Sequence, residues 1–297
     1  MVGGSPMIDQ APLEAPWIHG RPRGAPDTDP PLQVRALDAT TFVIRQSKSV
    51  TYEAPFLYLL VGAERALLLD TGAVEERRRC DVRGAVDALL PDDVDLLVAH
   101  SHGHGDHVAG DGQFAGRPRT TVVGRDVDSA RAGWGFTDGP EEVVELDLGG
   151  RLLEVVGIPG HHPTSVAVYD RQTGSLLTGD SVYPGRLYAP DPELHAASLD
   201  RLVAFAGQRP VQRVLGCHIE MRREGGDFPL GARYQPDEAA LPMSVDDLVA
   251  VRDGTRAAGG RPGVHRVGPA LLWNGSCYPA LARQVVRLVV DRVRGVA

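Results

Sequence analysis

The chain has few cysteines, no long apolar run and no excess of basic residues. Its three cysteines, Cys80, Cys217 and Cys277, stand at long spacings in 297 residues, so no disulfide framework is indicated and a cytoplasmic setting is expected. No signal peptide is recognisable, and no apolar run reaches the length of a membrane span, so no membrane partner is expected. The formal net charge of −8 argues against nucleic acid as the main partner.

The remaining composition is that of a globular protein. Hydrophobic residues make up 42% of the chain, enough for a sizeable core, and the length fits one large domain. Residues 1–31 are rich in proline, glycine and aspartate, which predicts a flexible or surface-draped N-terminal arm. Trp17 could dock this arm onto the body or onto a second subunit. The folded domain is expected to comprise residues 32–297.

Apolar runs bounded by turn residues predict strands, and longer periodic segments predict helices. The expected strands are residues 32–37, 41–45, 56–61, 66–69, 95–99, 120–123, 142–146, 152–156, 166–169, 175–180 and 210–218. The expected helices are residues 74–90, 245–252 and 279–293. The long polar and aromatic segment between the last strand and the closing helices, residues 219–245, is predicted to be a lid or substrate wall.

The densest group of metal-binding side chains directly follows the predicted strand 95–99. His102, His104, Asp106 and His107 stand within six residues, at a strand end where α/β sheets commonly place ligands. Small Gly103 allows the first two rings to turn toward one point, and the last two residues can begin a second site. Imidazole and carboxylate groups suit zinc, iron or manganese. A histidine-rich surface loop is the alternative, but such tracts are usually terminal rather than joined to a buried strand.

The order of residues 102–107, His-Gly-His-Gly-Asp-His, resembles the HxHxDH signature of the metallo-β-lactamase fold. Further positions match the family's later ligands in order. His161 follows a Pro-Gly turn, Asp180 ends a strand, and His218 follows an apolar run. Asp70, at the end of an early strand, is similar to the family's aspartate that supports the metal loop.

This resemblance implies a four-layer αββα sandwich, of the α/β or α+β class, with the metals at one edge. It implies two divalent metal ions, zinc above all, with iron or manganese as alternatives. The implied ligands form two groups joined by one carboxylate: His102, His104 and His161; Asp106, His107 and His218; and the bridging Asp180. The implied activity is hydrolysis of a small ester, lactone or thioester by a metal-bridging hydroxide, with Asp106 as the catalytic residue that orients it.

Two other activities of this fold stay open. A β-lactamase is less favoured, because β-lactamases of this fold tend to have cysteine or serine in place of Asp180. Glyoxalase II-like thioesterases and lactonases resemble this chain in having aspartate there. A mononuclear-iron oxidoreductase, similar to persulfide dioxygenases, would use a similar ligand order with one metal ion.

Residues outside the ligand set must select the small-molecule substrate. Tyr183 and Tyr188 could donate to an oxyanion or stack on the substrate, and Arg186 could pair with a substrate carboxylate. His162 stands where the family more often has a small hydroxyl residue, which makes it a substrate-facing candidate. Ordinary loop packing is the alternative for each. The arm and the closing helices could also form a homodimer.

Overall fold

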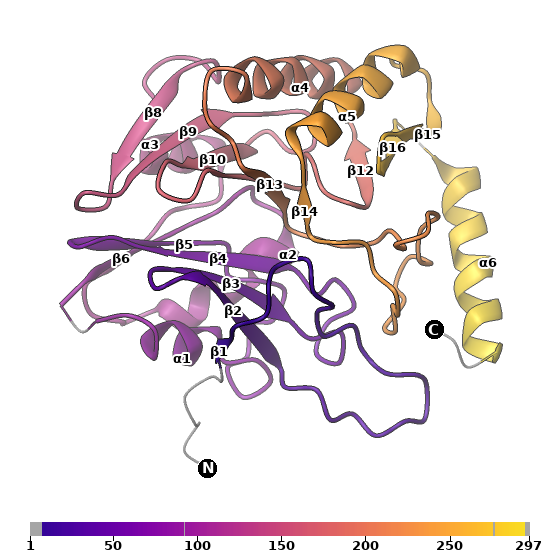
Figure 1. Ribbon diagram of the computed structural model, residues 1–297, viewed down its shortest axis with the longest axis horizontal. Helices are drawn as coiled ribbons and strands as arrows, with labels where there is room; N and C mark the ends of the chain where they lie inside the picture. The colour runs from indigo at the N-terminus through magenta and orange to yellow at the C-terminus, as the bar shows by residue number, and fades with distance from the viewer. Residues whose placement is uncertain (1–7, 92, 276, 295–297) are drawn as a thin grey trace.

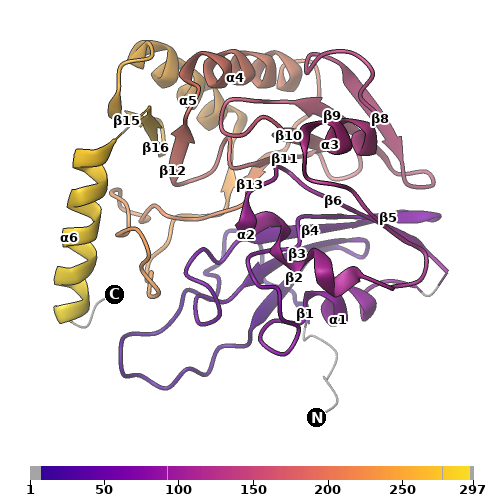
Figure 2. The ribbon, with the colours of Figure 1, turned by 180° about the vertical axis from the view of Figure 1, so that it is seen from behind.

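Two β-sheets pack face to face between helices in the computed structural model, which describes residues 8–91, 93–275 and 277–294 (Figure 1). Helices α4 and α5 cover one outer face and α1 covers the other, as both views show (Figures 1 and 2). The predicted four-layer αββα architecture is therefore confirmed. Buried side chains from both sheets, among them Tyr58, Leu67, Leu153 and Val155, form the core between the two inner layers.

The first sheet has seven strands in sequential order, β1 to β7. Its strands are β1 (Ile8–Asp9), β2 (Leu32–Asp38), β3 (Thr41–Gln46), β4 (Phe56–Val61), β5 (Arg65–Leu69), β6 (Asp95–Ala99) and β7 (Thr120–Val122). Every residue of β4 is buried, which explains its continuous apolar sequence. Strands β5, β6 and β7 are parallel, so their carboxyl ends lie at one edge.

The second sheet has six strands in the order β14-β13-β11-β10-β9-β8. These are β8 (Val143–Asp147), β9 (Leu152–Gly157), β10 (Val166–Asp170), β11 (Ser175–Gly179), β13 (Arg213–Gly216) and β14 (Pro242–Met243). Strands β9, β10 and β11 form an antiparallel meander, whereas β11 and β13 are parallel. The parallel pair places the residues that follow both strands at the same edge.

The helices differ from the prediction in length and number. They are α1 (Val82–Asp87), α2 (Gly105–Val108), α3 (Val127–Trp134), α4 (Pro192–Ala206), α5 (Val245–Ala258) and α6 (Tyr278–Arg294), with a 3₁₀ turn over Ala109–Phe114. The helix predicted for residues 74–90 is too long, because the Asp81 side chain accepts from the Gly84 N–H and caps the helix at Val82. Within the described part of the chain, no helix combines the length and apolar content needed to cross a bilayer.

A third sheet of three strands joins β12 (Arg186–Ala189), β16 (Ala270–Asn274) and β15 (Gly263–Val267). It was not predicted. Strand β12 follows the predicted ligand Asp180 after a short loop, residues 181–185, and pairs in parallel with β16, which comes from the C-terminal part of the chain. The third sheet thus ties the C-terminal region to the edge where the predicted ligands lie.

Residues 8–31 of the predicted arm drape over the body, and residues 1–7 lie outside the described residues. Trp17 is 4% exposed, and its ring meets Phe56 edge-to-face with 5.0 Å between centroids. The Arg35 guanidinium stacks 4.0 Å above the Trp17 ring and also pairs with Asp9. These contacts make Trp17 the anchor of the segment.

The segment 219–245 is largely packed. Met221, Phe228 and Leu241 are buried, and the Phe228 N–H donates to the Glu220 carbonyl. This packing suits a fixed wall better than a lid.

Replacing Trp17 with alanine is expected to lower the free energy of unfolding by about 3–5 kcal/mol, because it removes a buried aromatic side chain and leaves a cavity. Urea unfolding followed by fluorescence and circular dichroism measures the change. Val264→Ala is the control, since Val264 is 37% exposed on edge strand β15 and should change stability little. An equal, small effect of both substitutions would contradict the packed arrangement.

Candidate metal centre

The predicted ligands lie at the carboxyl ends of strands from both sheets. The HxHxDH segment follows β6 and continues into α2, whereas His161 lies in the turn between β9 and β10. Asp180 follows β11 and His218 follows β13 shortly after its end. Because β11 and β13 are parallel, these last two residues lie side by side. Residues far apart in the sequence thus meet at one edge of the sandwich.

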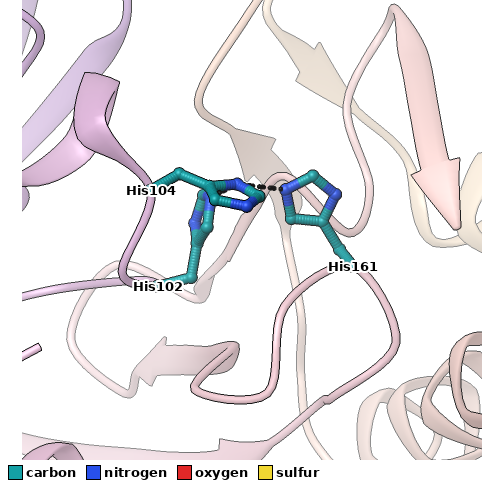
Figure 3. A group of neighbouring side chains, drawn as sticks. All are labelled: His102, His104 and His161. Atoms are coloured by element: carbon teal, nitrogen blue, oxygen red, sulfur yellow. Dashed lines mark hydrogen bonds between the residues drawn. The ribbon is translucent and has the colours of Figure 1, made fainter. Parts of the chain in front are cut away.

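Three histidines form the first group (Figure 3). His104 Nδ1 lies 3.0 Å from His102 Nε2 and 3.0 Å from His161 Nε2. A tetrahedral ion with metal–nitrogen bonds of about 2.0–2.1 Å separates neighbouring ligand atoms by about 3.3–3.4 Å. The three rings stand nearly perpendicular to one another, at 83° to 88°, so that their nitrogen atoms converge. The group fits one divalent metal ion.

The second group comprises Asp106, His107, Asp180 and His218. Asp106 Oδ2 lies 3.4 Å from His107 Nε2 and 3.3 Å from His218 Nε2. Asp180 Oδ1 lies 3.6 Å and 3.3 Å from the same two nitrogen atoms. His107 Nε2 and Asp180 Oδ1 are buried without a hydrogen-bond partner, an arrangement that is costly unless a cation fills it.

Asp180 connects the two groups. Its Oδ2 faces the first group, 3.7 Å from His161 Nε2 and 4.0 Å from His102 Nε2, while Oδ1 faces the second group. One carboxylate therefore presents an oxygen to each group. This is the placement expected of a bridging ligand.

Backbone carbonyls orient two of the histidines. His161 Nδ1 donates to the Tyr188 carbonyl oxygen at 2.9 Å, and His218 Nδ1 donates to the Glu53 carbonyl oxygen at 3.1 Å. With the proton on Nδ1, each ring turns the lone pair of Nε2 toward the centre. A hydrogen bond on the far nitrogen is the usual way in which proteins fix a metal-binding histidine.

Asp70 lies behind the centre and is fully buried. Its carboxylate accepts from the Ser101 N–H at 2.7 Å, the Ser101 hydroxyl at 2.8 Å and His107 Nδ1 at 2.9 Å. The Cys217 thiol also points to it at 3.4 Å. Asp70 itself has a left-handed backbone with φ of 69°. One carboxylate thus links the ends of β5, β6 and β13.

Charges within the site shift the pKa values in opposite directions. Burial lowers the pKa of His218, but the carboxylates of Asp180 and Asp106 outweigh burial and raise it to about 9. Burial would raise the pKa of Asp106 and Asp180, yet the neighbouring histidines lower it. Burial lowers the pKa of His102. The two carboxylates are therefore ionised and supply the negative charge that binds divalent cations.

A pocket of about 300 Å³ opens onto the centre. The ligand candidates on its wall are His104, Asp106, His161, Asp180 and His218. The rest of the wall consists of Glu53, Tyr183, Tyr188, Pro190, Glu220 and Leu230. The segment 219–245 thus contributes Glu220 and Leu230 to the wall.

Arg186 does not have the predicted role. It is 1% exposed, does not line the pocket, and forms ion pairs with Glu220 and Asp227, the latter at 3.1 Å. A buried guanidinium that is already paired is not available for a substrate carboxylate. Arg186 lies in β12, where its guanidinium pairs with Glu220, a residue of the pocket wall.

Tyr183 lines the pocket, but its hydroxyl donates to the Arg186 carbonyl oxygen and lies 3.2 Å from Glu220 Oε2. This hydroxyl is not free to stabilise an oxyanion. Tyr188 is half-buried on the wall, and its hydroxyl accepts from Arg186 Nε at 3.3 Å. None of the residues that the structure describes accepts the O–H proton of Tyr188.

His162 lies beside the first group but not on the wall of the pocket. Its ring centroid is 4.7 Å from that of His104, and its Nδ1 is 2.9 Å from the Thr164 hydroxyl. Glu53, which does line the pocket, was not singled out from the sequence. No motif marks it, because it stands in a loop between two strands far from the HxHxDH segment.

The arrangement of two sheets with these ligand groups at one edge defines a metal centre of the metallo-β-lactamase type. The model of the Metallo-beta-lactamase superfamily matches residues 51–218. The chain belongs to this superfamily, as its motif predicted.

Curated relatives carry the name hydroxyacylglutathione hydrolase. One, from Synechococcus sp. strain JA-3-3Ab, is 31% identical over 260 residues, which cover 81% of this chain and 93% of the relative. Another, from Synechococcus sp. strain JA-2-3B'a(2-13), is 36% identical over 205 residues, covering 63% and 72%. These relatives confirm the predicted class, a metal-dependent hydrolase of this fold.

Solved structures agree on the fold. An archaeal metallo-beta-lactamase superfamily protein from Sulfolobus tokodaii has a TM-score of 0.50 at 15% identity, covering 86% of this chain and 98% of that chain. The sec-alkylsulfatase Pisa1 from Pseudomonas sp. has a TM-score of 0.51 at 13% identity, covering 77% and 44%. At these identities the similarity concerns the fold alone.

Asp70→Asn is expected to weaken metal binding roughly 10–100-fold, because the amide cannot accept the same hydrogen bonds and His107 loses its orientation. Competition with a chromophoric chelator measures the affinity. Asp87→Asn is the matched control, since Asp87 contacts Arg83 and Arg117 at the surface. Unchanged affinity in a folded Asp70→Asn protein would show that Asp70 does not support the centre.

Proposed function

We propose that this protein is a dinuclear zinc hydrolase that cleaves a thioester. The observation that carries the proposal is Asp180, whose two oxygens face the two ligand groups. The curated relatives, which are named for hydrolysis of a hydroxyacylglutathione, support a thioester in preference to a lactone, another ester or a β-lactam. The three free thiols are compatible with the cytoplasm as its location.

Each of the two ligand groups would hold one metal ion. His102, His104 and His161 would hold one, Asp106, His107 and His218 the other, and Asp180 would contact both. When bound, such ions lower the pKa of water and polarise a carbonyl oxygen. Iron and manganese suit the same donor atoms and are the alternatives to zinc.

Asp106 would orient the nucleophilic water. Its Oδ2 faces His107 and His218, and the residue lines the pocket. The other carboxylate oxygen can therefore accept a hydrogen bond from a water molecule in the pocket. This orients the water toward the substrate carbonyl and corresponds to the role predicted from the sequence.

Tyr188 would donate to the oxygen of the substrate carbonyl. Arg186 Nε occupies the acceptor side of its hydroxyl, which leaves the O–H proton directed elsewhere. Burial and the charge of Glu220 raise the pKa of Tyr188 to about 12, so the hydroxyl keeps its proton at neutral pH. A donor placed at the carbonyl oxygen stabilises the negative charge that develops there.

A homodimer remains a prediction. The α6 side chains of Val285, Val286 and Val289 are 53%, 61% and 55% exposed, which offers an apolar surface for such a contact. Light scattering on the purified protein measures the oligomeric state.

The function is tested with protein loaded with zinc and freed of excess metal. Acyl thioesters, a lactone and a cephalosporin are compared as substrates, before and after removal of zinc by a chelator. We expect thioester turnover that is lost with the metal and restored by zinc. Oxygen uptake on a persulfide by an iron-loaded form, without any hydrolysis, would instead favour the oxidoreductase.

Tyr188→Phe is expected to lower kcat for the thioester by about 10²-fold, since it removes one donor to the developing oxyanion. Metal content should be unchanged, because the substitution keeps the Tyr188 backbone carbonyl that orients His161. Steady-state kinetics with metal analysis measure both. Tyr169→Phe, in a strand away from the pocket, is the control. A kcat equal to that of the wild type would exclude the donor role.

A further inference from the structure

Apart from the side chains that would hold the metal ions, the wall of the pocket is acidic. Among the residues that the structure describes, this wall contains no lysine or arginine, whereas Glu53 and Glu220 both contribute to it. A pocket made for an anionic ligand normally presents cationic or N–H donors to it. The charge of this wall therefore bears on which thioester the proposed hydrolase accepts.

Glu220 is not available to a ligand. Its carboxylate pairs with the Arg186 guanidinium and accepts from the Arg186 N–H at 2.8 Å. The Tyr183 hydroxyl lies 3.2 Å away on the same carboxylate. The negative charge of Glu220 is thus compensated within the wall.

Glu53 differs from Glu220, because no described arginine or lysine forms an ion pair with it. It is half-buried beside the centre. Burial raises the pKa of its carboxyl group, whereas His218 and the Tyr52 hydroxyl act to lower it. Lys48 is buried nearby in sequence, and its Nζ donates to the Tyr52 carbonyl oxygen at 3.1 Å. The Glu53 carboxyl group therefore lies on the pocket wall without an arginine or lysine partner among the described residues, where a ligand can reach it.

The backbone around Glu53 is held in place on both sides. His218 Nδ1 donates to the Glu53 carbonyl, and Lys48 holds the carbonyl of the preceding residue. The following residue, Ala54, is buried and has a φ of 46°, a left-handed conformation that alanine rarely adopts. Strained residues of this kind persist where the surroundings enforce them, and they cluster at functional sites.

We propose that Glu53 selects thioesters whose thiol portion carries a positively charged ammonium group and no carboxylate. The proposal rests on the proposed thioesterase function and concerns the leaving group of that reaction. An ammonium group in the pocket would pair with the Glu53 carboxylate, whereas a carboxylate in the same place would be repelled. Glutathione carries one ammonium group but also two carboxylates, so its net charge is negative. This chain would therefore differ in preference from relatives named for a glutathione thioester.

The first experiment compares thioesters with one acyl group and three thiols. These are thiocholine, which is cationic and whose quaternary ammonium cannot take up the acyl group, N-acetylcysteamine, which is neutral, and 3-mercaptopropionate, which is anionic. The measured quantity is the ratio of kcat/KM for the cationic to the anionic ester. In Glu53→Gln this ratio is expected to fall about tenfold, equivalent to about 1.4 kcal/mol.

Glu64→Gln is the matched control, because Glu64 is exposed in the turn before β5, away from the pocket. It should leave the ratio unchanged. Comparing each variant with the wild type cancels the intrinsic difference in reactivity among the three thioesters. A ratio that Glu53→Gln leaves unchanged would overturn the proposal while leaving the thioesterase function intact.

The second experiment does not depend on activity. Cysteamine and 3-mercaptopropionate are titrated into the zinc-loaded protein by calorimetry, since both present a thiolate to the metal and differ at the other end. We expect the affinity ratio to fall about tenfold in Glu53→Gln and to stay constant in Glu64→Gln. If no thioester is hydrolysed, the proposed function fails, and this ratio alone decides whether Glu53 recognises an amino group.

Discussion

The carboxylate of Asp70 is the constraint on which the site depends. It accepts from the backbone and hydroxyl of Ser101 and from His107, and the Cys217 thiol points to it. Each of these residues belongs to a different strand end or to the loop that carries the HxHxDH segment. Because the carboxylate is fully buried, losing any donor would leave a charge uncompensated in the core. The hydrogen bonds to the Asp70 carboxylate therefore hold the HxHxDH segment in position and also connect the two sheets.

Without metal ions, the close approach of the seven ligand candidates would cost folding free energy. Three imidazole nitrogens face one another in the first group, and two buried atoms of the second group lack partners. Divalent cations satisfy these atoms, so metal binding and the stability of this edge are coupled. The carbonyls of Tyr188 and Glu53, which orient His161 and His218, lie in segments that also form the pocket wall. The same two segments therefore orient metal ligands and line the substrate pocket.

The sequence predicted most of this centre because ligands at strand ends follow from short-range patterns. Apolar runs located the strands, and the spacing of the HxHxDH segment marked the first four ligand candidates. His161, Asp180 and His218 were assigned through the resemblance to the metallo-β-lactamase fold. The third sheet escaped prediction, because its pairing joins segments distant in sequence. The start of helix α4 is marked in the sequence, because Asp191 caps the helix and Pro192 occupies its first turn. The side chains of Arg186 and Glu53 could not be placed, because whether an ion pair forms depends on which segments meet in space.

The central claim is that these side chains form one centre for two ions. A crystal structure of the zinc-loaded protein, with anomalous diffraction collected above and below the zinc absorption edge, tests it most directly. We expect two anomalous peaks, one among His102, His104 and His161 and one among Asp106, His107 and His218, with Asp180 between them. A single peak, or peaks away from these side chains, would contradict the account.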